Sequence, residues 1–110
     1  MEPEVEQIGD VTVVTMGMES LDASNSEEFG ESLLAVIEGK TKIVFDMDAV
    51  RFVDSSGLKI FLMCLKRVRE TGGDLKLCEM AKPVRELFEL VRLHRMMDIC
   101  DTRDAAVKGF

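Results

Sequence analysis

Short strand-like and helix-like segments alternate along the whole chain, and this alternation limits the possible folds more than any other feature. The expected order is two strands and a helix, followed by three repeats of a strand and a helix. Parallel strands need a long crossover between them, usually a helix, whereas antiparallel strands can be joined by a short turn. The sequence therefore predicts an α/β fold: a mostly parallel central sheet of about five strands, with an N-terminal antiparallel strand and about four covering helices.

The expected strands are short and rich in apolar or β-branched residues. They cover residues 4–8, 11–18, 42–45, 75–78 and 96–100. Five β-branched residues in a row, 11–15, favour an extended backbone. Only Gly9 and Asp10 separate the first two segments, so we expect these to pair as a hairpin.

The expected helices repeat their apolar residues every three or four positions. Ser24 and Glu27 have the spacing of a capping box at the start of the first helix. The apolar face of the second helix consists of Leu58, Phe61, Leu62, Leu65 and Val68. Pro83 suits the first turn of the third helix, and Asp101 or Thr102 is expected to cap a short fourth one.

Composition limits the partners and the compartment. The chain has 110 residues, enough for one domain spanning residues 1–110, and its net charge of −7 with no Tyr or Trp argues against direct binding of nucleic acid. Charges interrupt every apolar run, and the acidic N-terminus does not resemble a signal peptide, so we expect a cytoplasmic protein that does not enter a membrane.

The cysteines and the histidine give no sign of a metal site or a cofactor. Cys64, Cys78 and Cys100 are odd in number, widely spaced and form no C-x-x-C pair, and His94 is the single histidine. We therefore expect the cysteines to be small core residues in a reducing compartment.

The segment V-D-S-S-G-L, residues 53–58, lies where a strand-like run gives way to the second helix. In α/β sheets, binding sites gather outside the carboxyl ends of the strands, and this turn is expected there. Asp54 or Ser55 is positioned to cap the helix, and Gly57 allows another backbone to approach. Asp22 and Asp46 follow other strands, so they are expected either beside Ser55 or as solvated acids of the loops. A serine at this junction can be a cap, a nucleophile or the acceptor of a modification.

Four segments and the order of elements together resemble the STAS domain of bacterial anti-sigma factor antagonists. The segments are V-D-S-S-G-L at 53–58, L-D-A at 21–23, G-G-D-L-K-L at 72–77 and P-V-R-E-L-F at 83–88. The resemblance covers essentially the whole chain.

This resemblance implies a function and a site. The serine directly after the aspartate, Ser55, is expected to be phosphorylated by a partner that is both a serine kinase and an anti-sigma factor. The unphosphorylated chain would bind that anti-sigma factor and release the sigma factor, and a serine phosphatase would restore it. The implied partner-binding residues are Asp22, Asp54, Ser55, Ser56, Gly57, Leu58 and Lys59. Lys59 departs from the small residue or arginine of many relatives and leaves the identity of the kinase open. We expect a monomer without a cofactor.

Two other functions are compatible with parts of the sequence. An enzyme with Ser55 or Ser56 as nucleophile fits poorly, because the glycine pattern is not G-x-S-x-G and His94 is the only histidine, although a Ser-Lys arrangement stays open. The second is an unphosphorylated STAS scaffold that binds a small molecule or nucleotide. We expect that the protein is not an enzyme.

Overall fold

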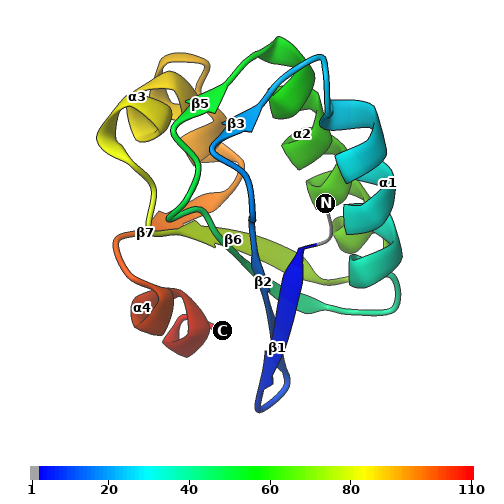
Figure 1. Ribbon diagram of the computed structural model, residues 1–110. Coiled ribbons are helices and arrows are strands. Elements are labelled where there is room, and N and C mark those ends of the chain that lie inside the picture. Colours follow the sequence, from blue (N-terminus) through cyan, green and yellow to red (C-terminus); the bar gives the residue numbers. More distant parts are fainter. Residues whose placement is uncertain (1–2) are drawn as a thin grey trace.

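A five-stranded mixed sheet forms the centre of the computed structural model, which describes residues 3–110. Its strands are β1 (Glu4–Ile8), β2 (Val11–Thr15), β4 (Lys42–Asp46), β6 (Asp74–Cys78) and β7 (Asp98–Cys100), in the spatial order β1-β2-β4-β6-β7 (Figure 1). β1 and β2 form the expected antiparallel hairpin, and every other neighbouring pair is parallel. The predicted α/β fold is confirmed.

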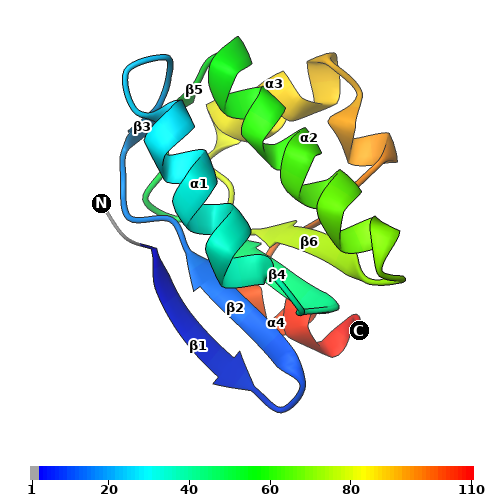
Figure 2. The ribbon, with the colours of Figure 1, turned by 90° about the vertical axis from the view of Figure 1, so that its right-hand side faces the viewer.

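Within residues 3–110, four α-helices and one 3-10 helix surround this sheet. They are α1 (Ser26–Ile37), α2 (Ser55–Glu70), α3 (Lys82–Leu90), η1 (Leu93–Arg95) and α4 (Arg103–Lys108). α1 and α2 lie side by side over one face, and the short α4 lies on the opposite face (Figure 2). In the part of the chain that the structure describes, no helix has both the length and the apolar composition needed to cross a bilayer.

The alternation of side chains along the strands divides the core into two clusters. On the α1–α2 face, Phe61 of α2 makes edge-to-face contacts with Phe45 of β4 and Phe88 of α3, at centroid distances of 6.1 and 5.4 Å. On the other face, Val44 and Cys78 pack with residues of α4. Neighbouring residues of one strand thus enter different clusters, because successive side chains of a strand point to opposite faces.

A second, two-stranded parallel sheet was not predicted. Its strands are β3 (Ser20–Leu21) and β5 (Phe52–Val53), with Leu21 opposite Val53. The sheet holds the segments that lead into α1 and α2 next to each other (Figure 1). It therefore brings the L-D-A turn beside the D-S-S-G turn.

Arg103 fastens α4 to the central sheet. Its guanidinium donates hydrogen bonds to Asp46 (3.0 Å), Glu6 (2.9 Å) and Thr15 (2.8 Å). The Asp46 carboxylate is buried and also accepts the Asp48 N–H at 3.0 Å. The prediction that Asp46 shapes the surface beside Ser55 is therefore wrong, because its carboxylate is held by α4 inside the structure.

Candidate functional site

Asp54 is the N-cap of α2. Its Oδ1 accepts hydrogen bonds from the backbone N–H groups of Ser56 (2.9 Å) and Gly57 (3.1 Å). These are two of the four N–H groups that a helix leaves unpaired at its start. Of the two predicted cap residues, Asp54 has this role, so Ser55 is the first residue of the helix rather than its cap.

The second oxygen of Asp54 joins α2 to the turn before α1. Oδ2 accepts a hydrogen bond from the Ala23 N–H at 3.1 Å, and the Asp54 N–H donates to the Leu21 carbonyl at 3.2 Å. One carboxylate thus both caps a helix and fixes a neighbouring loop. The structure brings the sequence-predicted residues Asp22 and Asp54 into adjacent turns.

Asp22 organises the turn before α1. Its carboxylate accepts hydrogen bonds from the Ser24 hydroxyl (2.5 Å), the Ser20 hydroxyl (2.8 Å) and the Ser24 N–H (2.9 Å). The bond from the Ser24 hydroxyl, followed by the bond from the Ser20 hydroxyl, holds the pKa of Asp22 below its ordinary value of 3.8. The predicted capping box is wrong: α1 begins at Ser26, and the Ser24 side chain bonds to Asp22 instead.

Gly57 lies where α2 approaches β3 most closely. A Cβ atom at this position would lie 2.7 Å from the Leu21 carbonyl oxygen and 2.8 Å from a Val53 methyl carbon. Any side chain here would push the helix away from the small sheet. The glycine therefore lets the D-S-S-G turn pack directly against β3 and β5, and the prediction that Gly57 allows another backbone to approach is confirmed.

The two serines differ in exposure. Ser55 is exposed at the first position of α2, whereas Ser56 is half-buried at the second and gives its N–H to Asp54. Within residues 3–110, no side chain forms a hydrogen bond with the Ser55 hydroxyl. Its oxygen is therefore accessible from solvent and is not engaged in the cap.

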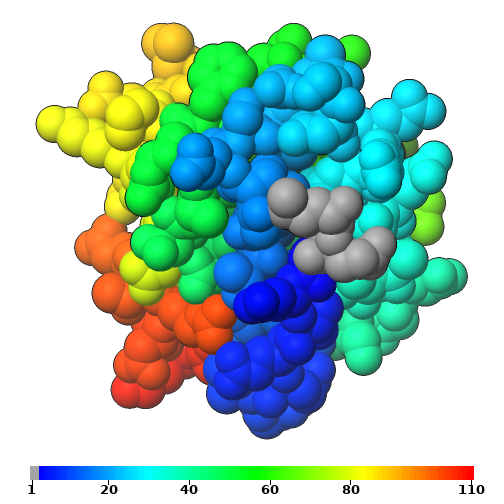
Figure 3. Space-filling model, in the orientation of Figure 1, coloured from blue at the N-terminus to red at the C-terminus, as the bar shows by residue number. Residues whose placement is uncertain are grey.

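The remaining predicted residues differ in what they offer to a partner. Lys59 is exposed one turn after Ser55, while Leu58 is half-buried and packs on the core. Phe52, which sequence reasoning missed, is 55% exposed on β5, two positions before Asp54. An aromatic ring exposed to this extent is a strong contact group for a protein partner. In Figure 3 the green surface around β5 borders the blue surface around β3.

Acidic side chains adjoin this end of the molecule. A hollow of about 300 Å³ beside the Asp22 turn is lined by Ala23, Ser24, Glu27, Glu28 and Glu31. Together with Asp22 these glutamates make the start of α1 negative, and the bond from the Ala23 N–H to Asp54 joins that turn to the D-S-S-G turn. A partner that docks here must supply positive charge or avoid this side.

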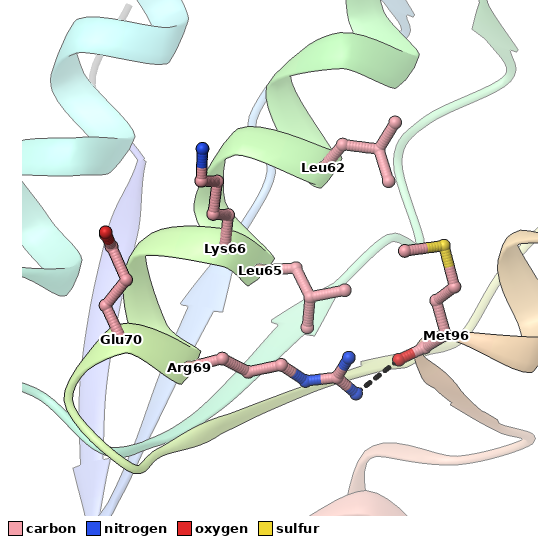
Figure 4. A pocket seen from close by; sticks show the side chains of 6 residues that line it. All are labelled: Leu62, Leu65, Lys66, Arg69, Glu70 and Met96. Atoms are coloured by element: carbon pink, nitrogen blue, oxygen red, sulfur yellow. Dashed lines mark hydrogen bonds between the residues drawn. The ribbon is translucent and has the colours of Figure 1, made fainter.

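A separate groove lies along the C-terminal half of α2. It has a volume of about 550 Å³ and is lined by Leu62, Leu65, Lys66, Arg69, Glu70 and Met96, which come from α2 and the segment after η1 (Figure 4). Arg69 reaches across it to donate a hydrogen bond to the Met96 carbonyl. The groove includes none of the sequence-predicted site residues and is distinct from the Ser55 surface.

The described residues provide no activating base for either serine. His94 lies exposed in η1, and neither His94 nor any lysine within residues 3–110 forms a hydrogen bond with Ser55 or Ser56. A nucleophilic serine needs a base within hydrogen-bonding distance.

Comparison with known proteins identifies the family. The model of the STAS domain matches residues 2–106, nearly the whole sequence. The chain belongs to the STAS domain family. This assignment agrees with the resemblance found in the sequence and with the observed mixed sheet.

Three proteins illustrate what this STAS chain is similar to. BtrV of Bordetella bronchiseptica, described as a candidate anti-sigma factor antagonist, is 30% identical over 91 residues, covering 82% of this chain and 78% of BtrV. The crystal structure of a candidate anti-sigma factor antagonist from Thermotoga maritima superposes with a TM-score of 0.89 at 24% identity, covering 97% of this chain and 92% of the other. SpoIIAA of Bacillus in its phosphorylated form superposes with a TM-score of 0.69 at 21% identity, covering 96% of both chains.

Proposed function

We propose that this STAS chain is an anti-sigma factor antagonist whose binding is switched off by phosphorylation of Ser55. In its unphosphorylated form it would bind an anti-sigma factor that is also a serine kinase, and so release the sigma factor. The observation that carries the proposal is the exposed Ser55 hydroxyl, free of side-chain hydrogen bonds, beside a cap that Asp54 already satisfies. The description of BtrV and the phosphorylated SpoIIAA structure support it.

The geometry suits phosphoryl transfer to Ser55. The Ser55 oxygen attacks the γ-phosphorus of ATP held by the kinase, its proton passes to a base of the kinase, and ADP leaves. The chain contributes an acceptor on a rigid helix, and the kinase contributes the catalytic groups. This role requires no cofactor and no catalytic residue in the STAS chain.

The phosphate would remain directed at the partner rather than fold into the helix cap. The Asp54 carboxylate already accepts the N–H groups of Ser56 and Gly57, so these donors are occupied. Phosphate adds about −1.5 to −2 charge, and Asp22, Asp54 and the nearby glutamates oppose its settling on the adjoining surface. The added charge and bulk would therefore be presented to the docked anti-sigma factor.

The proposed binding surface comprises the predicted residues and Phe52. Its centre is the D-S-S-G turn, flanked by the Asp22 turn on one side and by Lys59 on the next turn of α2. Phe52 would supply apolar contact area that the polar turn lacks. A serine phosphatase would reverse the modification, and we expect the free chain to act as a monomer in the cytoplasm.

One experiment tests the pathway and the site together. The purified chain is mixed with each anti-sigma kinase of its own genome and ATP, and phosphate is mapped by mass spectrometry. We expect phosphate on Ser55, none on the Ser55→Ala variant, and normal phosphorylation of the matched control Ser56→Ala. The Ser55→Ala variant should stay bound to the kinase in the presence of ATP. Phosphate on Ser56 of the wild-type chain would contradict the assignment.

A further inference from the structure

Cys78 and Cys100 occupy directly opposite positions on two neighbouring parallel strands. In the register of β6 and β7, Lys76 pairs with Asp98, Leu77 with Ile99 and Cys78 with Cys100. The two cysteines are far apart in sequence and form no motif, so only the pairing of the strands brings them together. Both are reduced in this structure.

The neighbouring pair on the same face of the sheet, Lys76 and Asp98, shows that side chains on β6 and β7 reach one another. Lys76 and Cys78 are two residues apart on β6, as are Asp98 and Cys100 on β7, so all four side chains share one face. Lys76 Nζ contacts Asp98 Oδ2 at 2.5 Å across the two strands. Cys78 and Cys100 both pack in the apolar cluster under α4, which places the two thiols on that same face.

The spacing of the strands is compatible with a disulfide. Neighbouring strands lie about 4.7–4.9 Å apart. Disulfide-bonded cysteines usually have Cα atoms about 4.4–6.8 Å apart. β7 has three residues and lies at the edge of the sheet, so a shift that brings the two sulfur atoms into bonding distance would displace no further strand of that sheet.

The two thiols differ in exposure, and this difference decides which one reacts first with an oxidant. Cys100 is partly exposed, whereas Cys78 is buried. Burial raises the pKa of the Cys78 thiol to about 12. A small oxidant therefore meets Cys100 first, and Cys78 serves as the second, resolving thiol.

We propose that Cys78 and Cys100 form a reversible disulfide with a low-molecular-weight disulfide as oxidant. The Cys100 thiolate attacks one sulfur of the small disulfide and expels one thiolate, which leaves a mixed disulfide on Cys100. Cys78 gives its proton to the expelled thiolate and attacks the Cys100 sulfur, which expels the second thiolate, and that thiolate takes up the proton that Cys100 had lost to solvent. The protein pair loses two electrons and two protons, and the small disulfide becomes two thiols.

The new bond would fasten the edge strand to the sheet without touching the Ser55 surface. It closes the segment that contains α3 and η1 into a covalent loop. Cys64 is the natural control, because it lies on α2 in the other core cluster and on the opposite face of the sheet. It has no cysteine partner within residues 3–110.

The test uses the native wild-type chain and glutathione disulfide. After incubation, free thiols are blocked with N-ethylmaleimide, and the unreduced protein is digested with trypsin. The three cysteines fall in separate peptides, residues 60–66, 77–85 and 96–103. We expect a cross-link between peptides 77–85 and 96–103, with a mass 2 Da below the sum of the two reduced peptides, that disappears with dithiothreitol. The Cys64→Ser variant should retain it, and Cys100→Ser should lose it.

Two results would overturn the proposal. One is a wild-type protein in which Cys100 carries glutathione while Cys78 is found only as its N-ethylmaleimide adduct, which shows that Cys78 was still a free thiol. The other is a cross-link that involves Cys64 or joins two chains in place of the 78–100 pair. Both results are obtained with the folded wild-type chain, so they do not depend on whether a variant folds.

Discussion

Asp54 Oδ2 accepts a hydrogen bond from the Ala23 N–H at 3.1 Å, and this contact joins two turns that are 31 residues apart in the sequence. The other oxygen of the same carboxylate caps α2. The Asp54 side chain therefore adds to the β3–β5 pairing and to the bond from the Asp54 N–H to the Leu21 carbonyl in fixing Ser55 relative to the Asp22 turn. Two of these contacts involve Asp54, so the site is sensitive to substitution at this residue.

Asp54→Ala should lower the free energy of unfolding by about 1–2 kcal/mol, because it removes a helix cap and the bond to the Ala23 N–H, which water then satisfies. Asp54→Asn should lose less, since asparagine is also a good cap. Urea unfolding monitored by circular dichroism measures both. An Asp54→Ala variant with the wild-type midpoint would show that the cap contributes nothing.

Gly57→Ala should destabilise the chain by about 1–3 kcal/mol, as overpacking of a tight contact does. The added methyl group would lie 2.7 Å from the Leu21 carbonyl oxygen, which belongs to the backbone and cannot rotate away. The matched control is Ser56→Ala, one residue earlier, which should change stability by less than about 0.5 kcal/mol. Equal unfolding midpoints for the two variants would refute the close-approach role.

The sequence predicted the main sheet and the helices because their signals are local. The β-branched run at 11–15 and the three- to four-residue repeat of α2 indicate a strand and a helix without knowledge of any contact. The β3–β5 sheet has no such signal. Each strand has two residues, and the pairing of Leu21 with Val53 depends on distant parts of the chain. Phe52 was missed for this reason.

Two site predictions failed where side chains had competing partners. Ser24 has the spacing of a cap residue, but the Asp22 carboxylate lies two residues away and takes its hydroxyl. Asp46 follows a strand as expected, but Arg103, 57 residues later, binds its carboxylate. Local spacing cannot rank such alternatives, because the stronger partner is fixed only after the helices pack.

Arg103→Ala should lower the free energy of unfolding by about 2–3 kcal/mol. It leaves the buried Asp46 carboxylate without its cation, and the loss is smaller than for a wholly buried pair because the Arg103 side chain is 32% exposed. Lys108→Ala, which breaks the exposed pair with Asp104 on the same helix, should cost less than about 0.5 kcal/mol. Thermal unfolding of both variants measures the two losses, and so compares the partly buried Arg103–Asp46 pair with the exposed Lys108–Asp104 pair.

Ser24→Ala should raise the pKa of Asp22 toward 3.8, because it removes the hydroxyl bond that contributes most to the lowering. NMR titration of the Asp22 side-chain carbon measures this. A lowered folded-state pKa gives stability that is present above the unfolded value of 3.8 and is lost as the pH falls through the folded value. The variant should therefore be less stable than the wild-type chain near pH 7, and the difference should shrink as the pH falls through the folded-state pKa of Asp22.

Ser55→Asp should stay folded and bind the anti-sigma factor far more weakly than the wild-type chain. Negative charge at a helix N-terminus is favoured by about 0.3–1 kcal/mol, so α2 should not melt. At the interface, the new charge adds to Asp54 and the acidic turn. Docking would remove water from this added charge without a cation placed to pair with it, which costs several kcal/mol and corresponds to a loss of orders of magnitude in affinity.

Circular dichroism and a titration with the cognate anti-sigma factor separate the two effects of Ser55→Asp. The isosteric neutral control is Ser55→Asn, which has a similar volume and no charge. We expect near-native spectra for both variants, a large loss of affinity for Ser55→Asp and a smaller one for Ser55→Asn. If both variants lose affinity equally, bulk rather than charge opposes docking. If Ser55→Asp is folded and binds as tightly as wild type, phosphate at this position cannot be the switch.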